Sequence, residues 1–481
     1  ERVNCCDDPL IAERGFTEDE HNWMVEYPTA YLIPFDAQLD AQSQNPTQRS
    51  DAEANRLVQW LLDNNIRLER LTEPMTWQDT TYPEGSYVVP MDQAFRGLAM
   101  TTLGDGQDIS DRIDRLYAPP GAWSKSLLGG ADVVEIPRDD EEFQPATTPI
   151  DSPNSLAAGT RIGDAEWYAV NLRGQSEASA LLDELRGGQI DVELATDEFT
   201  SADQTELPAG SLVFGNDART VRALRTAARE TGLTVERGTG PRPAGEAVDH
   251  TPRVAVLVND AEPTMDATLW SLQRLFGPDA EFVSVTEGPG SLQNAPTDPL
   301  AAYDVIYNAG QDYPSAESET AQTRLQSFFD RGGGYIGTGQ SSNNVDFLND
   351  GDLLASPLTL DSQEADGGIA TWTNTGADGP ITGGYAATDY LYLPTDITYF
   401  TSTPVGSTID GRYPADTADI FVAGLWTDRD DSATGGPVVV HGPTTAGSRY
   451  VAYATDPFSR GDAERAWTLI AQAALWTSAG D

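Results

Sequence analysis

The chain has 481 residues, a net charge of −47 and 29 basic residues, of which only Lys125 is a lysine. So acidic a surface repels nucleic acid and anionic lipid, which argues against either as a partner and favours a solvated, salt-tolerant exterior. No apolar run approaches the length of a membrane span, and the length itself predicts several domains.

The first 26 residues are interpreted as the remnant of a junction with an upstream region. They show no basic and apolar leader pattern. They contain both cysteines of the chain, Cys5 and Cys6. Adjacent cysteines either close a strained ring or each bond to a partner elsewhere, so their pairing stays open.

Two later segments repeat the same order of residue types. One reads IRLERLTEPMTWQDTTYPEGSYVVPMD from Ile66, and the other reads IDVELATDEFTSADQTELPAGSLVFGND from Ile190. Gly85 of the first matches Gly210 of the second, each in a Pro-x-Gly-Ser turn. The matches predict a duplication, with Ile66 and Ile190 on equivalent buried strands and the two glycines in equivalent turns.

Each copy has the same flanks, which predict two small α/β units at residues 27–145 and 163–237. An apolar strand, AYLIPF or WYAVNL, precedes a helix whose apolar residues recur at intervals of three and four. Strands separated by helices favour parallel pairing. Segments rich in proline, glycine and small residues, 146–162 and 238–251, are interpreted as linkers.

A third unit, residues 252–481, begins with the strand RVAVLVND. Helices expected at 267–276 and 317–331 alternate with the strands FVSV, DVIYN and GYIG. This alternation is typical of a doubly wound α/β sheet. β-rich material is expected from 369 to 440, and the apolar run AERAWTLIAQAALW predicts a final helix.

The run GGGYIGTGQSSNN in this unit has the strand–turn–helix pattern that exposes a nucleophile at a sheet edge. A class I glutamine amidotransferase elbow reads Gly-x-Cys-x-Gly, and a histidine activates the cysteine. Here the run starts at Gly337 and Gly339 takes the nucleophile position, so the elbow is degenerate. The remaining catalytic alternative uses Ser341 or Ser342 with His441.

The sequence offers weak metal candidates only. The three histidines are far apart and none stands in a zinc-binding pattern, so no zinc site and no other cofactor is expected on this chain. Asp428, Asp430 and Asp431, in TDRDDSATGG, are the candidates for calcium. The run lacks the helix–loop–helix calcium signature, and a solvated loop explains it as well.

Longer strings span most of the chain, among them YPTAYLIP, DISDRIDRLYAPPGAWS, YDVIYNAGQDYP, FFDRGGGYIGTGQSSNN and VVVHGPTTAGSRYVAYATDPFSRGDAERAW. Their order resembles the C-terminal half of large secreted zinc carboxypeptidases of the carboxypeptidase A-like family. The resemblance implies an upstream catalytic domain that holds zinc through His-x-x-Glu and a later histidine, with a glutamate as general base. None of these residues maps onto a position in this chain.

The resemblance completes the expected fold class. It is α/β, with two duplicated small α/β units followed by a flavodoxin-like, class I glutamine amidotransferase-like doubly wound domain with β-rich additions. The leading interpretation is a non-catalytic region of an extracellular metallocarboxypeptidase, whose partners are the N-terminal peptidase domain and peptide substrates. The alternatives are a free-standing serine hydrolase or amidotransferase-like enzyme and an extracellular module that binds glycans or peptides.

Overall fold

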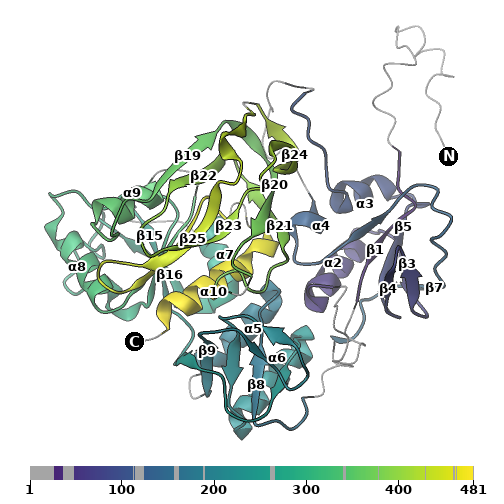
Figure 1. Ribbon diagram of the computed structural model, residues 1–481, viewed down its shortest axis with the longest axis horizontal. Helices are drawn as coiled ribbons and strands as arrows, with labels where there is room; N and C mark the ends of the chain where they lie inside the picture. Colours follow the sequence, from purple (N-terminus) through teal and green to yellow (C-terminus); the bar gives the residue numbers. More distant parts are fainter. Residues whose placement is uncertain are drawn as a thin grey trace.

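The computed structural model describes residues 26–35, 48–111, 113, 124–156, 162–187, 190–260, 266–339, 343–377, 379–427, 429–458, 461 and 463–479. The fold is mixed α/β, with three groups of helices and strands along the chain (Figure 1). The two smaller groups are called the first and second units here. The third unit holds the large sheet and the final helix.

The first unit is a five-stranded sheet in the order β6-β1-β5-β2-β7. Its strands are β1 (Ala30–Ile33), β2 (Leu68–Leu71), β5 (Tyr87–Pro90), β6 (Val134–Ile136) and β7 (Thr147–Ile150). The hairpin β3 (Met75–Trp77) and β4 (Thr80–Tyr82) projects from it, and its helices are α2 (Asp51–Asp63), α3 (Arg96–Leu103) and α4 (Lys125–Leu128). The apolar face of α2 is buried on this sheet, as its sequence pattern predicts.

The second unit repeats this order as β13-β8-β12-β9-β14. Its strands are β8 (Trp167–Val170), β9 (Val192–Ala195), β12 (Leu212–Phe214), β13 (Glu236–Gly238) and β14 (Gly245–Ala247). A hairpin of β10 (Phe199–Thr200) and β11 (Glu206–Leu207) stands where the first unit has β3 and β4, and the helices are α5 (Gln175–Arg186) and α6 (Ala218–Thr231). The two units therefore share one strand order.

The expected parallel pairing is wrong for both small units, because every strand pair in their five-stranded sheets is antiparallel. The strands on either side of each helix are not neighbours. In the first unit β5 lies between β1 and β2 and pairs with both. This is a split β-α-β arrangement, in which the returning strand separates the two that the helix connects.

The repeated turn is the same in both units. Gly85 and Gly210 have φ of 95° and 81°, a conformation that favours glycine. The amide of Gly85 donates to the Leu71 carbonyl at 3.0 Å, and that of Gly210 donates to the Ala195 carbonyl at 2.8 Å. Ile66 and Ile190 do occupy equivalent positions, although each lies two residues before a strand rather than in one.

Both segments expected to be linkers contribute edge strands. β7 comes from the segment 146–162 and pairs with β2, while β14 comes from the segment 238–251 and pairs with β9. A proline in β7 fits an edge position, because an edge strand leaves one row of amide groups without a ladder partner. Proline and glycine thus marked sheet edges rather than the ends of the units.

The third unit contains a ten-stranded sheet. Its parallel part, β16-β15-β17-β18-β26, has the order 2-1-3-4-5 when its strands are numbered along the chain, an order found in doubly wound sheets. These strands are β15 (Val254–Val258), β16 (Ala280–Ser284), β17 (Val305–Asn308), β18 (Gly334–Gly337) and β26 (Arg449–Tyr453).

An antiparallel extension continues the same sheet beyond β26. It consists of β20 (Ala365–Asn374), β21 (Thr388–Leu393), β23 (Thr408–Arg412), β24 (Phe421–Trp426) and β25 (Pro437–Pro443), with the pair β19 (Thr359–Gln363) and β22 (Ile397–Ser402) beside it. The helices of the unit are α7 (Ala267–Phe276), α8 (Glu319–Asp330), α9 (Asn343–Asp350) and α10 (Trp467–Ser478), with short 3-10 turns η4 (Gly277–Asp279), η5 (Pro299–Ala302), η6 (Thr417–Asp419), η7 (Asp431–Ala433) and η9 (Glu464–Ala466).

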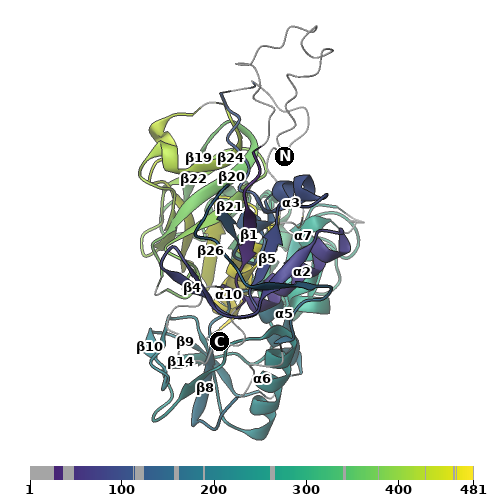
Figure 2. The same cartoon turned by 90° about the vertical axis from the view of Figure 1, so that its right-hand side faces the viewer.

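Helix α5 of the second unit connects the three units, because it contacts α2, α7 and α10 (Figures 1 and 2). The N-termini of the equivalent helices α2 and α5 meet. Glu53 accepts a hydrogen bond from the amide of Ser176 at 2.9 Å. A Cβ atom on Gly174 would lie 2.6 Å from the hydroxyl of Ser50, so only glycine permits this approach.

Candidate functional site

The degenerate elbow lies at the carboxyl end of β18, between the ends of β17 and β26. Thr338 is fully buried, and its amide donates to the Asn308 carbonyl at 2.9 Å. The amide of Gly339 donates to the Thr455 carbonyl at 3.1 Å, which fixes the turn against the next strand. The carboxyl edge of a doubly wound sheet is the usual place for a ligand site.

Gly339 has φ of 115°, and a Cβ atom there would lie 3.2 Å from the Ala309 carbonyl oxygen. Both the backbone conformation and the space therefore favour glycine. With no side chain at this position, the turn itself offers no nucleophile. Ser341 and Ser342 lie outside the described residues.

Asp456, just beyond the end of β26, is the titratable group beside the elbow. Burial raises its pKa to about 6, the Asp266 carboxylate raises it further, and bonds from the Phe458 amide and the Tyr307 hydroxyl oppose the shift. The Thr338 hydroxyl donates to the Tyr307 oxygen at 2.9 Å. A carboxyl group that titrates near neutral pH is suited to proton transfer, but the described turn places no reactive group next to it.

His441 lies in the middle of the sheet rather than at its carboxyl edge. In β25 it pairs with Val451 of β26, which lies level with Ile336 of β18. Gly339 is three residues further along and two strands away. At about 3.3 Å per residue and about 4.8 Å between strands, the two positions are roughly 14 Å apart.

The His441 ring is held by two neighbours. Nδ1 lies 2.6 Å from Oδ2 of Asp410, and the ring meets that of Trp476 edge-on at 4.7 Å. Burial raises the pKa of Asp410, while the bond and charge of His441 lower it. This pair is suited to holding α10 against the sheet, because Trp476 belongs to that helix.

The weak calcium candidates take part in local turns. Asp430 accepts bonds from the Ser432 amide at 2.7 Å and from Gln363 at 2.6 Å, and Asp431 accepts one from the Thr417 hydroxyl at 2.5 Å. The third candidate, Asp428, is not among the described residues. Within the described ranges no group of three or more His, Cys, Asp or Glu residues is arranged to hold a metal ion.

One site was not expected from the sequence: a cavity of about 430 Å³ where the three units meet. Arg49 comes from the first unit, Arg173 from the second, and Asp389 and Arg465 from the third. Asp389 is fully buried and lies 3.0 Å from Arg49, and it also bonds to Arg465. Burial alone would raise the pKa of Asp389, but the two arginines lower it.

This cluster lacked a local sequence signal, because its members come from distant parts of the chain and each stands alone in its segment. Arg49 also stacks on the Tyr385 ring at 4.1 Å, and Arg465 bonds to Asp132 at 3.1 Å. The arginines therefore act here as buried connections between units. An invariant spacing between units in relatives would be needed to find such a cluster from sequence.

No family model matches this chain, and no curated protein matches it. Among solved structures it is similar to a putative GMP synthase protein from Thermoplasma acidophilum, with 11% identity, 48% of this chain and 95% of that chain covered, and a TM-score of 0.31. A putative ThuA-like protein from Bacteroides uniformis has 13% identity, coverage of 46% and 90%, and a TM-score of 0.31. Alpha-L-fucosidase isoenzyme 2 from Paenibacillus thiaminolyticus has 17% identity, coverage of 47% and 32%, and a TM-score of 0.28. No helix within the described ranges is both long and apolar enough to span a membrane.

Proposed function

We propose that this chain is a non-catalytic C-terminal region of a secreted zinc metallocarboxypeptidase, in which it supports the catalytic half and presents peptide substrates. The zinc site belongs to the upstream domain. The observation that carries the proposal is the vacant elbow, where Gly339 has φ of 115° and provides no side chain for attack on an acyl carbon.

The order 2-1-3-4-5 of the parallel strands supports a flavodoxin-like, class I glutamine amidotransferase-like origin of the third unit. Such a domain without a nucleophile at its elbow keeps a rigid core. The position of His441 agrees with this role, because the ring bonds to Asp410 and contacts Trp476 about 14 Å from the elbow.

A scaffold role also agrees with the contacts between units. Ion pairs connect Arg56 to Glu464 at 2.7 Å and Arg186 to Asp279 at 2.7 Å, in addition to the Asp389 cluster. Pairs that fix one arrangement of three units are suited to holding a further domain in a constant orientation. Loss of such pairs is costly when they are buried.

The proposal is tested by assays of the purified chain and of a precursor that includes the upstream region. We expect carboxypeptidase activity only when the upstream region is present, and a His-x-x-Glu motif in its sequence. The chain alone should show no glutaminase, esterase or carboxypeptidase activity. Serine-reactive electrophiles should leave residues 332–344 unmodified.

The competing hydrolase would behave differently. Stoichiometric labelling of Ser341 or Ser342, lost in a folded His441→Gln variant, would reverse the assignment and make the chain an enzyme. Absence of any peptidase motif upstream would remove the metallocarboxypeptidase from the proposal. The circular dichroism spectrum of each variant separates loss of reactivity from loss of fold.

A further inference from the structure

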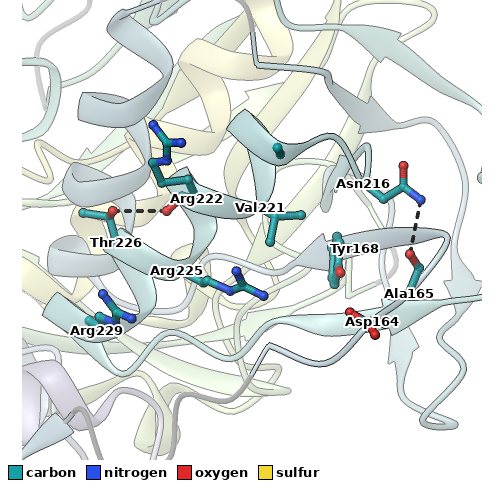
Figure 3. Close-up of a pocket in the computed structure, with 10 residues that line it drawn as sticks. Asp164, Ala165, Tyr168, Asn216, Val221, Arg222, Arg225, Thr226 and Arg229 are labelled. Atoms are coloured by element: carbon teal, nitrogen blue, oxygen red, sulfur yellow. Dashed lines mark hydrogen bonds between the residues drawn. The ribbon is translucent and has the colours of Figure 1, made fainter.

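A row of arginines on helix α6 borders a surface pocket of about 770 Å³ in the second unit (Figure 3). Arg222, Arg225 and Arg229 are exposed and line it from the helix. Asp164 and Tyr168 line the other side, and Arg225 points toward them in Figure 3. The opposite face of α6 is buried through Ala223, Leu224, Ala227 and Ala228, among others, so the arginines occupy the outward side.

These three arginines have no ion pair or hydrogen bond from their guanidinium groups within the described part of the chain. This is unusual in a protein with 76 acidic and 29 basic residues, where most cations have an abundance of carboxylates within reach. Other arginines do pair, such as Arg237 with Asp203. Even Asp164, in the same pocket, makes no ion pair with the three.

The arrangement also has a cost for the helix. Arg222 and Arg225 are three positions apart, and Arg225 and Arg229 are four positions apart, so like charges are neighbours on one face. Each such pair destabilises a helix by about 0.2–0.5 kcal/mol. A ligand of opposite charge would remove this repulsion, whereas a purely solvated face would gain nothing from collecting three cations.

We infer that this pocket binds acidic peptide segments, with carboxylate side chains paired to Arg222, Arg225 and Arg229. At about 1.5 Å per helical residue, Arg225 and Arg229 are about 6 Å apart along the axis. Alternate side chains of an extended peptide are about 6.6 Å apart on one side. Glutamate or aspartate at alternate positions therefore matches the spacing, and guanidinium groups bind carboxylates through two parallel hydrogen bonds.

Nucleic acid is a poorer match, because the net charge of −47 repels a long polyanion over its whole length. A short peptide meets mainly the local field of the pocket once salt screens the rest of the surface, since the Debye length is about 8 Å at 0.15 M. The assignment of such peptides as substrates to be presented to a peptidase rests on the proposed function; the binding site itself does not.

The test measures fluorescence anisotropy of the purified chain with a short fluorescein-labelled peptide of alternating glutamate and serine. The variant Arg222→Gln/Arg225→Gln/Arg229→Gln keeps the side-chain length and the helix propensity. The matched control, Arg67→Gln/Arg70→Gln/Arg138→Gln, removes the same charge from the first unit. All three chains are compared at the lowest salt concentration at which their far-UV circular dichroism is native.

We expect the pocket variant to weaken binding by about tenfold or more and the control to change it by less than about twofold. An equal loss in the control, or no binding by the parent chain, overturns the inference. Equal binding of a lysine–serine peptide also overturns it, and tighter arginine-dependent binding of oligogalacturonate reassigns the pocket to acidic glycans. Binding by a chain that proves to be a hydrolase would keep this site and remove the proposed function.

Discussion

Nδ1 of His441 lies 2.6 Å from Oδ2 of Asp410, whose side chain is fully buried in the sheet of the third unit. The other carboxylate oxygen of Asp410 has no hydrogen-bond partner among the described residues. Its charge therefore depends on the histidine. A buried carboxylate that loses its one close cationic or donor partner is costly to keep ionised.

We expect His441→Ala to lower the free energy of unfolding by about 3 kcal/mol at neutral pH. The measurement is denaturant unfolding at constant molar salt. Because burial raises the folded pKa of Asp410 above its unfolded value, its protonation favours the native state, so the deficit should shrink as the pH falls. Replacement of Asp410 by Asn in the same chain should restore part of the loss; a variant as stable as the parent would show that the pair is not structural.

A second prediction concerns the junction of the three units. Asp389→Ala leaves the buried guanidinium groups of Arg49 and Arg465 without their shared carboxylate. We expect a loss of about 3–5 kcal/mol, detected as a lower melting temperature. Asp92→Asn is the control, because its partner Arg67 is exposed and such pairs contribute about 0–1 kcal/mol.

The pH dependence of this cluster has the opposite sign to that of Asp410. The two arginines lower the folded pKa of Asp389 below its unfolded value despite burial, so its contribution is present above pH 3.8 and is lost at lower pH. The parent chain and Asp389→Ala should therefore approach each other in stability below about pH 4. A constant difference down to pH 2 would contradict the assignment of the cluster as ionic.

The sequence predicted what depends on local pattern. The spacing of apolar residues placed the helix Ala267–Phe276, and the structure has α7 at the same bounds. The glycine turns of the duplication were also placed correctly, since a positive φ has a residue preference of its own. Strand partners were not, because β5 joins β1 and β2 only through contacts distant in the chain.

The same reason explains the outcome at the candidate sites. Gly339 was recognisable because the elbow is a local motif, and its positive φ agrees with that interpretation. The bond between Asp389 and Arg49 joins residues 340 positions apart, and no periodicity reports it. The arginines of α6 were visible as a charged helix face, but their lack of carboxylate partners among the described residues appears only in three dimensions.

A third prediction uses Asp456, whose pKa burial raises to about 6. The native state binds a proton that the unfolded state releases between about pH 4 and pH 6, so this group's contribution to stability falls as the pH rises through 6. Asp456→Asn should therefore stabilise the protein at pH 7.5, by at most about 3 kcal/mol, and have little effect near pH 4. Glu141→Gln, which removes an exposed carboxylate, should show no such pH step; an equal step in both would assign the effect to net charge.

A fourth prediction concerns salt. The 47 excess negative charges repel one another over about 30 Å at 0.01 M salt but over only about 3 Å at 1 M. The melting temperature should rise as sodium chloride is added, with most of the rise at low concentration because screening acts first on distant charges. A flat or falling curve would show that repulsion does not limit stability.

The last prediction is that the elbow is architectural. Gly339→Ala forces an L side chain to adopt φ of 115° and brings Cβ within 3.2 Å of the Ala309 carbonyl oxygen. We expect a loss of about 1–3 kcal/mol in the free energy of unfolding, measured by denaturant titration. Gly290→Ala is the control, because its φ is outside the left-handed region and no atom lies within 4 Å of the added Cβ. Gly339→Cys should lose stability in the same way and gain no glutaminase activity, since His441 is about 14 Å away. Glutaminase turnover by Gly339→Cys, abolished by His441→Gln, would show instead that the elbow retains a working catalytic partner.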